Sequence, residues 1–231
     1  MGELLLLEKL KGQLIVSCQA LEDEPLHGSE IMARMALAAK EGGAAAIRAN
    51  GFEDIKEIKQ TIKLPVIGIV KRNYHDSEIY ISPTMKEVDE VHSAGAEILA
   101  LDLTNRDRPD GLSNEEMILM IKEKFPALLI MADISTYEEG IAAADLGLDL
   151  IGTTLAGYTS YSKKFDHPDF ELISKLSQEL SVPIIAEGRI NTPEEAARCL
   201  ELGAWSVVVG TAITRPQLIT KRFSERLGIR G

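Results

Sequence analysis

The fold is decided by two stretches near the end of the chain, Val182-Pro-Ile-Ile-Ala-Glu-Gly-Arg-Ile-Asn191 and Trp205-Ser-Val-Val-Val-Gly-Thr-Ala-Ile-Thr214. Each begins with a short apolar run that is rich in Val and Ile, too short for a helix, and ended abruptly by glycine. A helix is expected to begin directly after each glycine. Two successive junctions of this kind are typical of a (β/α)₈ barrel with a phosphate site after its seventh and eighth strands.

The same unit of helix, glycine and apolar run recurs along the whole chain. Four helix starts have the spacing of a capping box, a Thr or Ser followed three residues later by Glu, at Thr84, Ser113, Thr136 and Thr192. Glycines end the preceding helices. The eight apolar runs lie near residues 13–17, 44–48, 66–71, 97–102, 128–133, 149–153, 182–187 and 205–210. Division of the chain by eight gives about 29 residues per unit, the length that a βα unit needs.

These runs are continuously apolar, which indicates strands buried on both faces of a parallel sheet. An open doubly wound sheet is the alternative, but eight even units without a long insertion favour closure. The sequence therefore predicts an α/β fold, a single (β/α)₈ TIM barrel forming one domain over residues 1–231. We expect the apolar patch Leu4–Leu7 to lie in a short N-terminal helix that covers the barrel bottom.

Composition excludes several classes of partner. The 231 residues are 45% hydrophobic, enough for a single core, and their net charge of −11 argues against nucleic acids and anionic membranes as partners. No apolar run reaches the roughly 18 residues of a membrane helix. The two cysteines, Cys18 and Cys199, form no disulfide framework, so we expect a cytoplasmic protein.

Functional residues of a TIM barrel lie at the C-terminal ends of the strands. The residues at these positions are far more polar than the strands that precede them. A single one of them could be a solvated loop residue, but the set together indicates a site. The set is Cys18, Gln19, Arg48, Lys71, Arg72, Asp102, Asp133, Thr153, Thr154, Glu187, Gly188, Gly210 and Thr211.

Lys71 and Glu187 are the candidate catalytic pair. Lys71 directly follows an apolar run, and partial desolvation there lowers the pKa of an amine toward that of a base or a Schiff-base former. Glu187 belongs to strand seven, opposite strand three in a ring of eight, so the two side chains can approach a substrate from opposite sides. The alternatives are a surface lysine or phosphate clamp, and an ion pair of Glu187 with Arg48 or Arg189.

Other strand ends supply candidate binding groups. Arg48 offers a rigid fork for a carboxylate, hydroxyls or an oxyanion. Asp133 suits sugar hydroxyls, or alternatively caps the following helix. Phosphate is expected at the last two junctions, where backbone N–H groups and one or two basic side chains can hold it. The candidates there are Gly188, Arg189, Gly210, Thr211 and Arg215.

Other chemistries have no support. The four histidines share no ligand spacing, so we expect no metal site, and the nucleotide-binding glycine motifs are missing, so we expect no cofactor. Cys18 is better explained as a small buried hydrophobe than as a nucleophile. The loop at 158–162 is long enough to be a lid, and an ordinary surface loop is an equally good interpretation.

Several motifs resemble the N-acetylmannosamine-6-phosphate 2-epimerase family over nearly the whole chain. They are Ile15-Val-Ser-Cys-Gln-Ala-Leu21, Glu24-Pro-Leu26, Gly43-Ala-Ala-Ala-Ile-Arg-Ala49, Pro65-Val-Ile-Gly-Ile-Val-Lys-Arg72, Met131-Ala-Asp133, Ile151-Gly-Thr-Thr154, Gly157-Tyr-Thr159, Ala186-Glu-Gly188 and Ala212-Ile-Thr-Arg-Pro216. The resemblance implies a cytoplasmic TIM-barrel isomerase of bacterial sialic acid and amino-sugar breakdown. Such an enzyme converts N-acetylmannosamine 6-phosphate to N-acetylglucosamine 6-phosphate without a metal or nucleotide.

The resemblance also assigns roles to single residues. It implies catalytic roles for Lys71 and Glu187. Arg215 corresponds to the arginine of the family's closing Ile-Thr-Arg-Pro motif. The residues that contact the sugar are implied to be Gln19, Arg48 and Asp133. The chain departs from the family pattern at Thr211, where a second glycine is expected, and at Leu103, where alanine is usual.

The expected reaction starts from the open-chain sugar, because the C2 hydrogen is acidic only beside an aldehyde. Lys71 would take the C2 proton, and a proton would return to the opposite face from Glu187 or from Lys71 itself. Two alternatives stay open: a Schiff-base aldolase or lyase that uses Lys71, and a non-catalytic sugar-phosphate sensor. The helix after Pro216 is a plausible surface for a homodimer.

Overall fold

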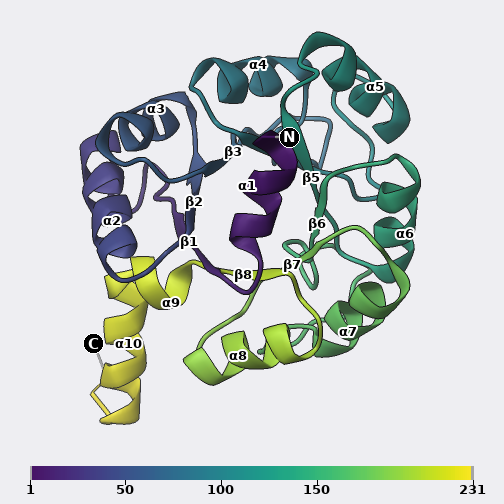
Figure 1. The fold of residues 1–231 in the computed structure, drawn as a ribbon. Coiled ribbons are helices and arrows are strands. Elements are labelled where there is room, and N and C mark those ends of the chain that lie inside the picture. The colour runs from purple at the N-terminus through teal and green to yellow at the C-terminus, as the bar shows by residue number, and fades with distance from the viewer. Residues whose placement is uncertain (1, 230–231) are drawn as a thin grey trace.

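Residues 2–229 are described by a computed structural model, in which eight parallel strands form one closed barrel in chain order (Figure 1). This confirms the predicted TIM barrel and excludes the open sheet. The strands are β1 (Leu14–Cys18), β2 (Ala46–Asn50), β3 (Val66–Ile69), β4 (Ile98–Asp102), β5 (Leu129–Asp133), β6 (Leu150–Gly152), β7 (Ile184–Glu187) and β8 (Ser206–Val209). The helices are α1 (Gly2–Leu10), α2 (Ser29–Glu41), α3 (Phe52–Thr61), α4 (Met85–Ser93), α5 (Asn114–Lys124), α6 (Tyr137–Asp145), α7 (Phe170–Glu179), α8 (Pro193–Glu201), α9 (Thr211–Thr214) and α10 (Pro216–Arg226).

The strands are buried on both faces, as their continuous apolarity predicts. One apolar cluster fills the barrel interior and includes Ile15, Ile67 and Ile98. A second, larger cluster lies between the strands and the ring of helices and includes Ile47 and Leu99. Because apolar side chains pack against both faces of the strands, the strand ends are fixed in place. The polar residues that follow them are therefore held in a defined arrangement.

Helix starts follow the predicted capping chemistry with one difference. Complete capping boxes form at Thr84, Ser113 and Thr136. At Thr192 the side chain accepts from the backbone N–H of Glu195, but the Glu195 carboxylate accepts from the N–H of Asn191, at 2.6 Å, rather than from Thr192. The reciprocal bond is therefore displaced by one residue, into the loop that follows β7.

The barrel closes through contacts between the beginning and the end of the chain. β1 pairs in parallel with β8, and the N–H of Gly12 donates to the carbonyl of Trp205 at 2.6 Å. The Trp205 indole donates to the carbonyl of Leu7 at 2.9 Å, and Leu10 is buried in the interior cluster. Helix α1 thus lies across the barrel bottom, as predicted (Figure 1). Among residues 2–229 no helix is both long and apolar enough to cross a membrane.

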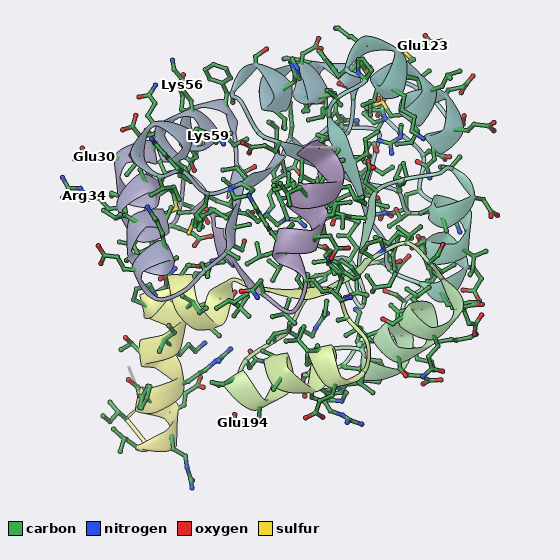
Figure 2. All side chains as sticks on the ribbon, viewed as in Figure 1. Glu30, Arg34, Lys56, Lys59, Glu123 and Glu194 are labelled. Atoms are coloured by element: carbon green, nitrogen blue, oxygen red, sulfur yellow. The ribbon has the colours of Figure 1, made fainter. Side chains whose placement is uncertain are left out.

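Charged side chains cover the outer faces of the ring of helices. In Figure 2 the labelled Glu30, Arg34, Lys56, Glu123 and Glu194 point outward from it. The Glu30–Arg34 pair joins at 2.8 Å and is three-quarters exposed, so it adds little stability. Helix α10 departs from this pattern, since it extends away from the ring and none of its residues 216–226 is buried (Figure 1).

Candidate active site

A cavity of about 370 Å³ opens at the C-terminal ends of the strands. Its lining draws on residues at the ends of β1, β2, β3, β7 and β8 or directly after β1, β3, β6, β7 and β8. Nine of the ten predicted site residues line it: Gln19, Arg48, Lys71, Glu187, Gly188, Arg189, Gly210, Thr211 and Arg215. The tenth, Asp133, is fully buried beside Arg48.

Arg48 is the centre of a buried polar network. Its side chain is 1% exposed, and its two terminal nitrogens donate to the Asp133 carboxylate at 3.1 and 2.5 Å. One of these nitrogens also donates to Glu187 at 2.6 Å. A buried guanidinium is costly unless it is paired, and two carboxylates pair it here. Arg48 is thereby held rigidly at the cavity wall.

Thr154 connects the two carboxylates of this network. Its hydroxyl oxygen lies 2.6 Å from Asp133 and 3.1 Å from Glu187. A hydroxyl carries one proton and can donate it only once. The shorter distance makes Asp133 its main acceptor, and the longer contact with Glu187 is the weaker of the two. Thr154 was recognised from the sequence only as a strand-end residue, without a role.

The protonation of Glu187 is governed mainly by burial. Burial raises the pKa of Glu187 above the usual range of a carboxyl group; the Arg48 charge and the Thr154 hydrogen bond oppose that increase, and the Asp133 charge supports it. Glu187 is therefore both an ion-pair partner of Arg48, one of the alternatives considered from the sequence, and a carboxyl group able to carry a proton near neutral pH.

Lys71 stands at the end of β3 with a free amine. Its backbone N–H donates to the side chain of Asn50 at 2.8 Å, and the residue bridges to Ile81 in antiparallel fashion. Within residues 2–229 the amine has no hydrogen-bond or ion-pair partner. Burial, with the nearby charges of Arg48 and Arg215, lowers the pKa of Lys71 to about 8. A substantial neutral fraction at physiological pH makes this amine a competent base.

The last two junctions form the opposite side of the cavity. Gly188 and Arg189 have φ of 103° and 56°, so the chain turns through two left-handed residues after β7. After β8, Gly210 precedes α9, whose first residue is Thr211. Among the residues described, the positive φ values of non-glycine residues fall at Ser82 and Arg189, so Thr211 occupies its position without backbone strain.

The basic side chains of these junctions differ in their freedom. The Arg189 guanidinium donates to the carbonyls of Ala156 and Gly157 and lies 4.0 Å above the ring of Tyr158, so it is engaged with the β6–α7 loop. Arg215 faces the cavity and is held by two hydrogen bonds to Glu24, at 2.8 and 2.6 Å. Glu24 orients this arginine, although the sequence suggested no role for it beyond the motif.

Cys18, the last residue of β1, and Gln19, which follows it, have different environments. The Gln19 amide donates to the Ser17 hydroxyl at 2.8 Å, which leaves its carbonyl oxygen available at the cavity. Cys18 is fully buried, and burial raises the pKa of its thiol to about 12. A protonated, inaccessible thiol is no nucleophile, which agrees with its interpretation as a core residue.

Tyr80 and Asn191 are polar lining residues that the strand-end rule does not predict. Tyr80 reaches the cavity because the chain after β3 returns to pair Lys71 with Ile81. Asn191 reaches it through the left-handed turn after β7, and its side chain accepts from Arg222 of α10 at 2.5 Å. The loop after β3 and the turn after β7 have no recurring residue pattern in the sequence. The spacing of residues therefore could not predict that Tyr80 and Asn191 line the cavity.

Comparisons with known proteins find relatives over nearly the whole chain. Residues 32–228 match the model of the family described as "Putative N-acetylmannosamine-6-phosphate epimerase". Proteins named "Putative N-acetylmannosamine-6-phosphate 2-epimerase" from Caldanaerobacter subterraneus subsp. tengcongensis and Clostridium perfringens (strain SM101 / Type A) are each 60% identical, over 94% and 96% of this chain and 92% and 100% of theirs. The solved structure of the N-acetylmannosamine-6-phosphate 2-epimerase from Clostridium perfringens superposes with a TM-score of 0.92 at 60% identity, covering 96% of both chains.

Proposed function

The chain belongs to the N-acetylmannosamine-6-phosphate epimerase family, and from this we propose that it converts N-acetylmannosamine 6-phosphate to N-acetylglucosamine 6-phosphate by inverting C2. The observation that carries the proposal is the free amine of Lys71, facing a cavity whose other side holds the buried carboxyl group of Glu187. The relatives named above support neither the aldolase nor the sensor alternative.

The reaction begins with ring opening, which places an aldehyde at C1. The neutral amine of Lys71 takes the C2 proton, and the electron pair moves onto O1 to give an enediolate-type intermediate. The Arg48 guanidinium lies beside this site and stabilises the developing negative charge. As the O1 electron pair returns, C2 takes a proton on its opposite face, and the C2 configuration is inverted.

Glu187 is the best-supported donor of that second proton. Its pKa, raised by burial, supports a protonated fraction of this carboxyl group near neutral pH. Its place on β7, across the barrel from β3, supports delivery to the face opposite Lys71. In this assignment Asp133, fully buried, contacts Arg48 and Thr154 and positions them for the sugar.

Phosphate binding fixes the reacting carbon relative to Lys71. We place the 6-phosphate at the junctions after β7 and β8, against Gly188, the Arg189 backbone, Gly210 and the N–H of Thr211, with Arg215 as the counter-charge. Gln19 is placed against sugar hydroxyls. Because the 6-phosphate is bound far from C2, its binding energy holds C2 in position beside Lys71. Proton transfer then takes place as if within one molecule.

Proton NMR of the purified protein with N-acetylmannosamine 6-phosphate in D₂O tests the reaction. We expect N-acetylglucosamine 6-phosphate with deuterium at C2, because the two acid–base groups exchange their protons with solvent. The Lys71→Ala variant should give no turnover while still binding the sugar phosphate. Ligand binding by the wild type without turnover would instead favour the sensor, and a product trapped on Lys71 by borohydride would favour the aldolase.

We also propose that the enzyme acts as a homodimer in the cytoplasm. Helix α10 and its neighbours expose the apolar side chains of Ile213, Leu218, Phe223 and Leu227, of which Phe223 is 69% and Leu227 73% exposed. A second copy, placed by a two-fold axis, would cover this surface. The unpaired, buried cysteines suit a reducing compartment, and cell fractionation tests the location.

A further inference from the structure

Tyr80 brings a phenol hydroxyl without a partner to the cavity beside Lys71. The chain after β3 runs back along the strand end, so that the Arg72 N–H donates to the Tyr80 carbonyl at 3.0 Å and Lys71 pairs with Ile81. The Tyr80 ring packs on the interior apolar cluster, and its side chain lines the cavity. Its hydroxyl makes no hydrogen bond to any residue in the range 2–229.

The state of this hydroxyl is set by its surroundings. Burial raises the pKa of Tyr80 to about 12, and the charges of Asp102 and Asp133 act in the same direction. The group is therefore a neutral O–H at every physiological pH, a hydrogen-bond donor that also accepts. The two aspartates are occupied elsewhere, Asp102 by Arg106 at 2.5 Å and Asp133 by Arg48.

The substrate geometry leaves one group for this donor, and this step rests on the proposed function. With the 6-phosphate at the β7 and β8 junctions and C2 at Lys71, the sugar crosses the cavity and its C1–C2 end reaches the β3 side. Two groups end there, O1 and the acylamino substituent on C2. Arg48 provides the charge for O1, so the amide carbonyl is the acceptor that needs a neutral donor.

We propose that Tyr80 is the specificity-determining residue for the 2-acylamino group, with its hydroxyl donating to the amide carbonyl. The aromatic ring of Tyr80, together with Ile81 and Tyr158, lines the same cavity and provides an apolar wall for the acyl methyl. A site built to hydrogen-bond one substituent discriminates against sugars that lack it, because its donor is then left unpaired.

Equilibrium titration with two sugar phosphates tests this role. N-acetylglucosamine 6-phosphate carries the acylamino group, and glucose 6-phosphate carries a hydroxyl in its place. Tyr80→Phe should weaken binding of the first about tenfold, which is the loss of one neutral hydrogen bond, and leave binding of the second within twofold. Tyr74→Phe is the matched control, because Tyr74 lies in the same segment and its hydroxyl binds Glu87 at 3.0 Å, outside the cavity lining. This control should leave both affinities within twofold.

Other outcomes would overturn the assignment. Equal losses for both ligands in Tyr80→Phe would make Tyr80 a general part of the wall or a partner of O1. Unchanged affinities would mean that the hydroxyl does not contact the ligand, and matching losses in Tyr74→Phe would assign the effect to the segment. Turnover by the wild type is followed in parallel, so that a failure of the epimerase proposal is seen separately from a failure of the acyl contact.

Discussion

At the scale of single residues, the site depends on a positive charge that is fully buried. Arg48 is surrounded by the carboxylates of Asp133 and Glu187, and its Nε has no hydrogen-bond partner in the part of the chain that the structure describes. Such a group is stable only while its partners remain, since removal of one leaves an uncompensated charge away from water. The ion pairs that hold Arg48 rigidly for the reaction are therefore also needed for the stability of the folded protein.

Asp133→Ala should lower the free energy of unfolding by about 3 kcal/mol, as expected for breaking a buried ion pair. It should also reduce turnover, because Arg48 and Thr154 lose their common anchor. Urea unfolding followed by circular dichroism measures the first effect. Asp89→Ala is the control, since it breaks the half-exposed Lys124–Asp89 pair and should cost less than about 1 kcal/mol. Similar losses in both variants would contradict the role of Asp133.

The pH dependence of kcat/KM should follow Lys71. Burial disfavours the charged ammonium and lowers the pKa of Lys71 to about 8, so the free enzyme holds the active, neutral amine above that pH. Below the pKa values of both Lys71 and Glu187, kcat/KM should fall about tenfold per pH unit as the ammonium forms, and at high pH it should fall again as Glu187 loses the proton that it donates to C2. The measurement is a pH–rate profile between pH 6 and 9.5. A rate that stays flat from pH 6 to 8 would exclude Lys71 as the base that acts on C2.

At the scale of elements, strand β3 positions Lys71 through very close packing at Gly68. A Cβ added at Gly68 would lie 2.7 Å from a methyl of Val91 and 2.8 Å from the Cβ of Ala96. Both lie at or near helix α4, and Ala96 has no flexible side chain that could move aside. The strand can approach this helix only because residue 68 has no side chain.

Gly68→Ala should therefore destabilise the protein by about 1–3 kcal/mol, the usual cost of overpacking. It should also reduce turnover, because a displaced β3 carries Lys71 with it. Thermal unfolding and the epimerase assay measure the two effects. Gly42→Ala makes the same chemical change at a negative φ with contacts no closer than 3.4 Å, and it should alter stability by less than about 0.5 kcal/mol. A Gly68→Ala variant as stable as this control would refute the close-packing argument.

The strands could be predicted from their continuous apolar runs. The loops that fold back onto the strand ends could not. All eight strands lie within two residues of their predicted bounds, because burial on both faces requires uninterrupted apolar runs. Site residues directly after those runs were found for the same reason. Tyr80 is placed by a loop that folds back on the end of β3, and Asn191 and Arg215 are held by side-chain contacts with Arg222 and Glu24. Such contacts leave no spacing in the sequence to recognise.

At the scale of the whole molecule, helix α10 joins an exposed surface to the cavity. Leu218 and Phe223 expose apolar side chains on it, while Arg222 holds the side chain of Asn191 at 2.5 Å. The Asn191 side chain in turn donates to the Arg189 carbonyl at 2.7 Å, at the turn proposed to bind phosphate. Covering α10 with a second copy would thus stabilise the phosphate side of the cavity.

Phe223→Glu should shift the proposed dimer to the monomer, because it places a charge in the apolar surface that a second copy would cover. Analytical ultracentrifugation measures the shift, and the KM for the sugar phosphate should rise in the monomer. Leu119→Glu introduces the same charge at a position on α5 that is 57% exposed and should leave the association unchanged. A wild type that sediments as a monomer at all concentrations would contradict the dimer.

The pairing of β1 with β8 has a consequence for synthesis. The ribosome makes β1 at the start of translation, yet the strand that completes its pairing is added about 190 residues later. At 5–20 residues per second the nascent chain waits roughly 10–40 s with that edge uncovered. An uncovered parallel strand is a template for association between neighbouring nascent chains, so production of this protein is expected to depend on chaperones that shield the growing chain until its last strand emerges.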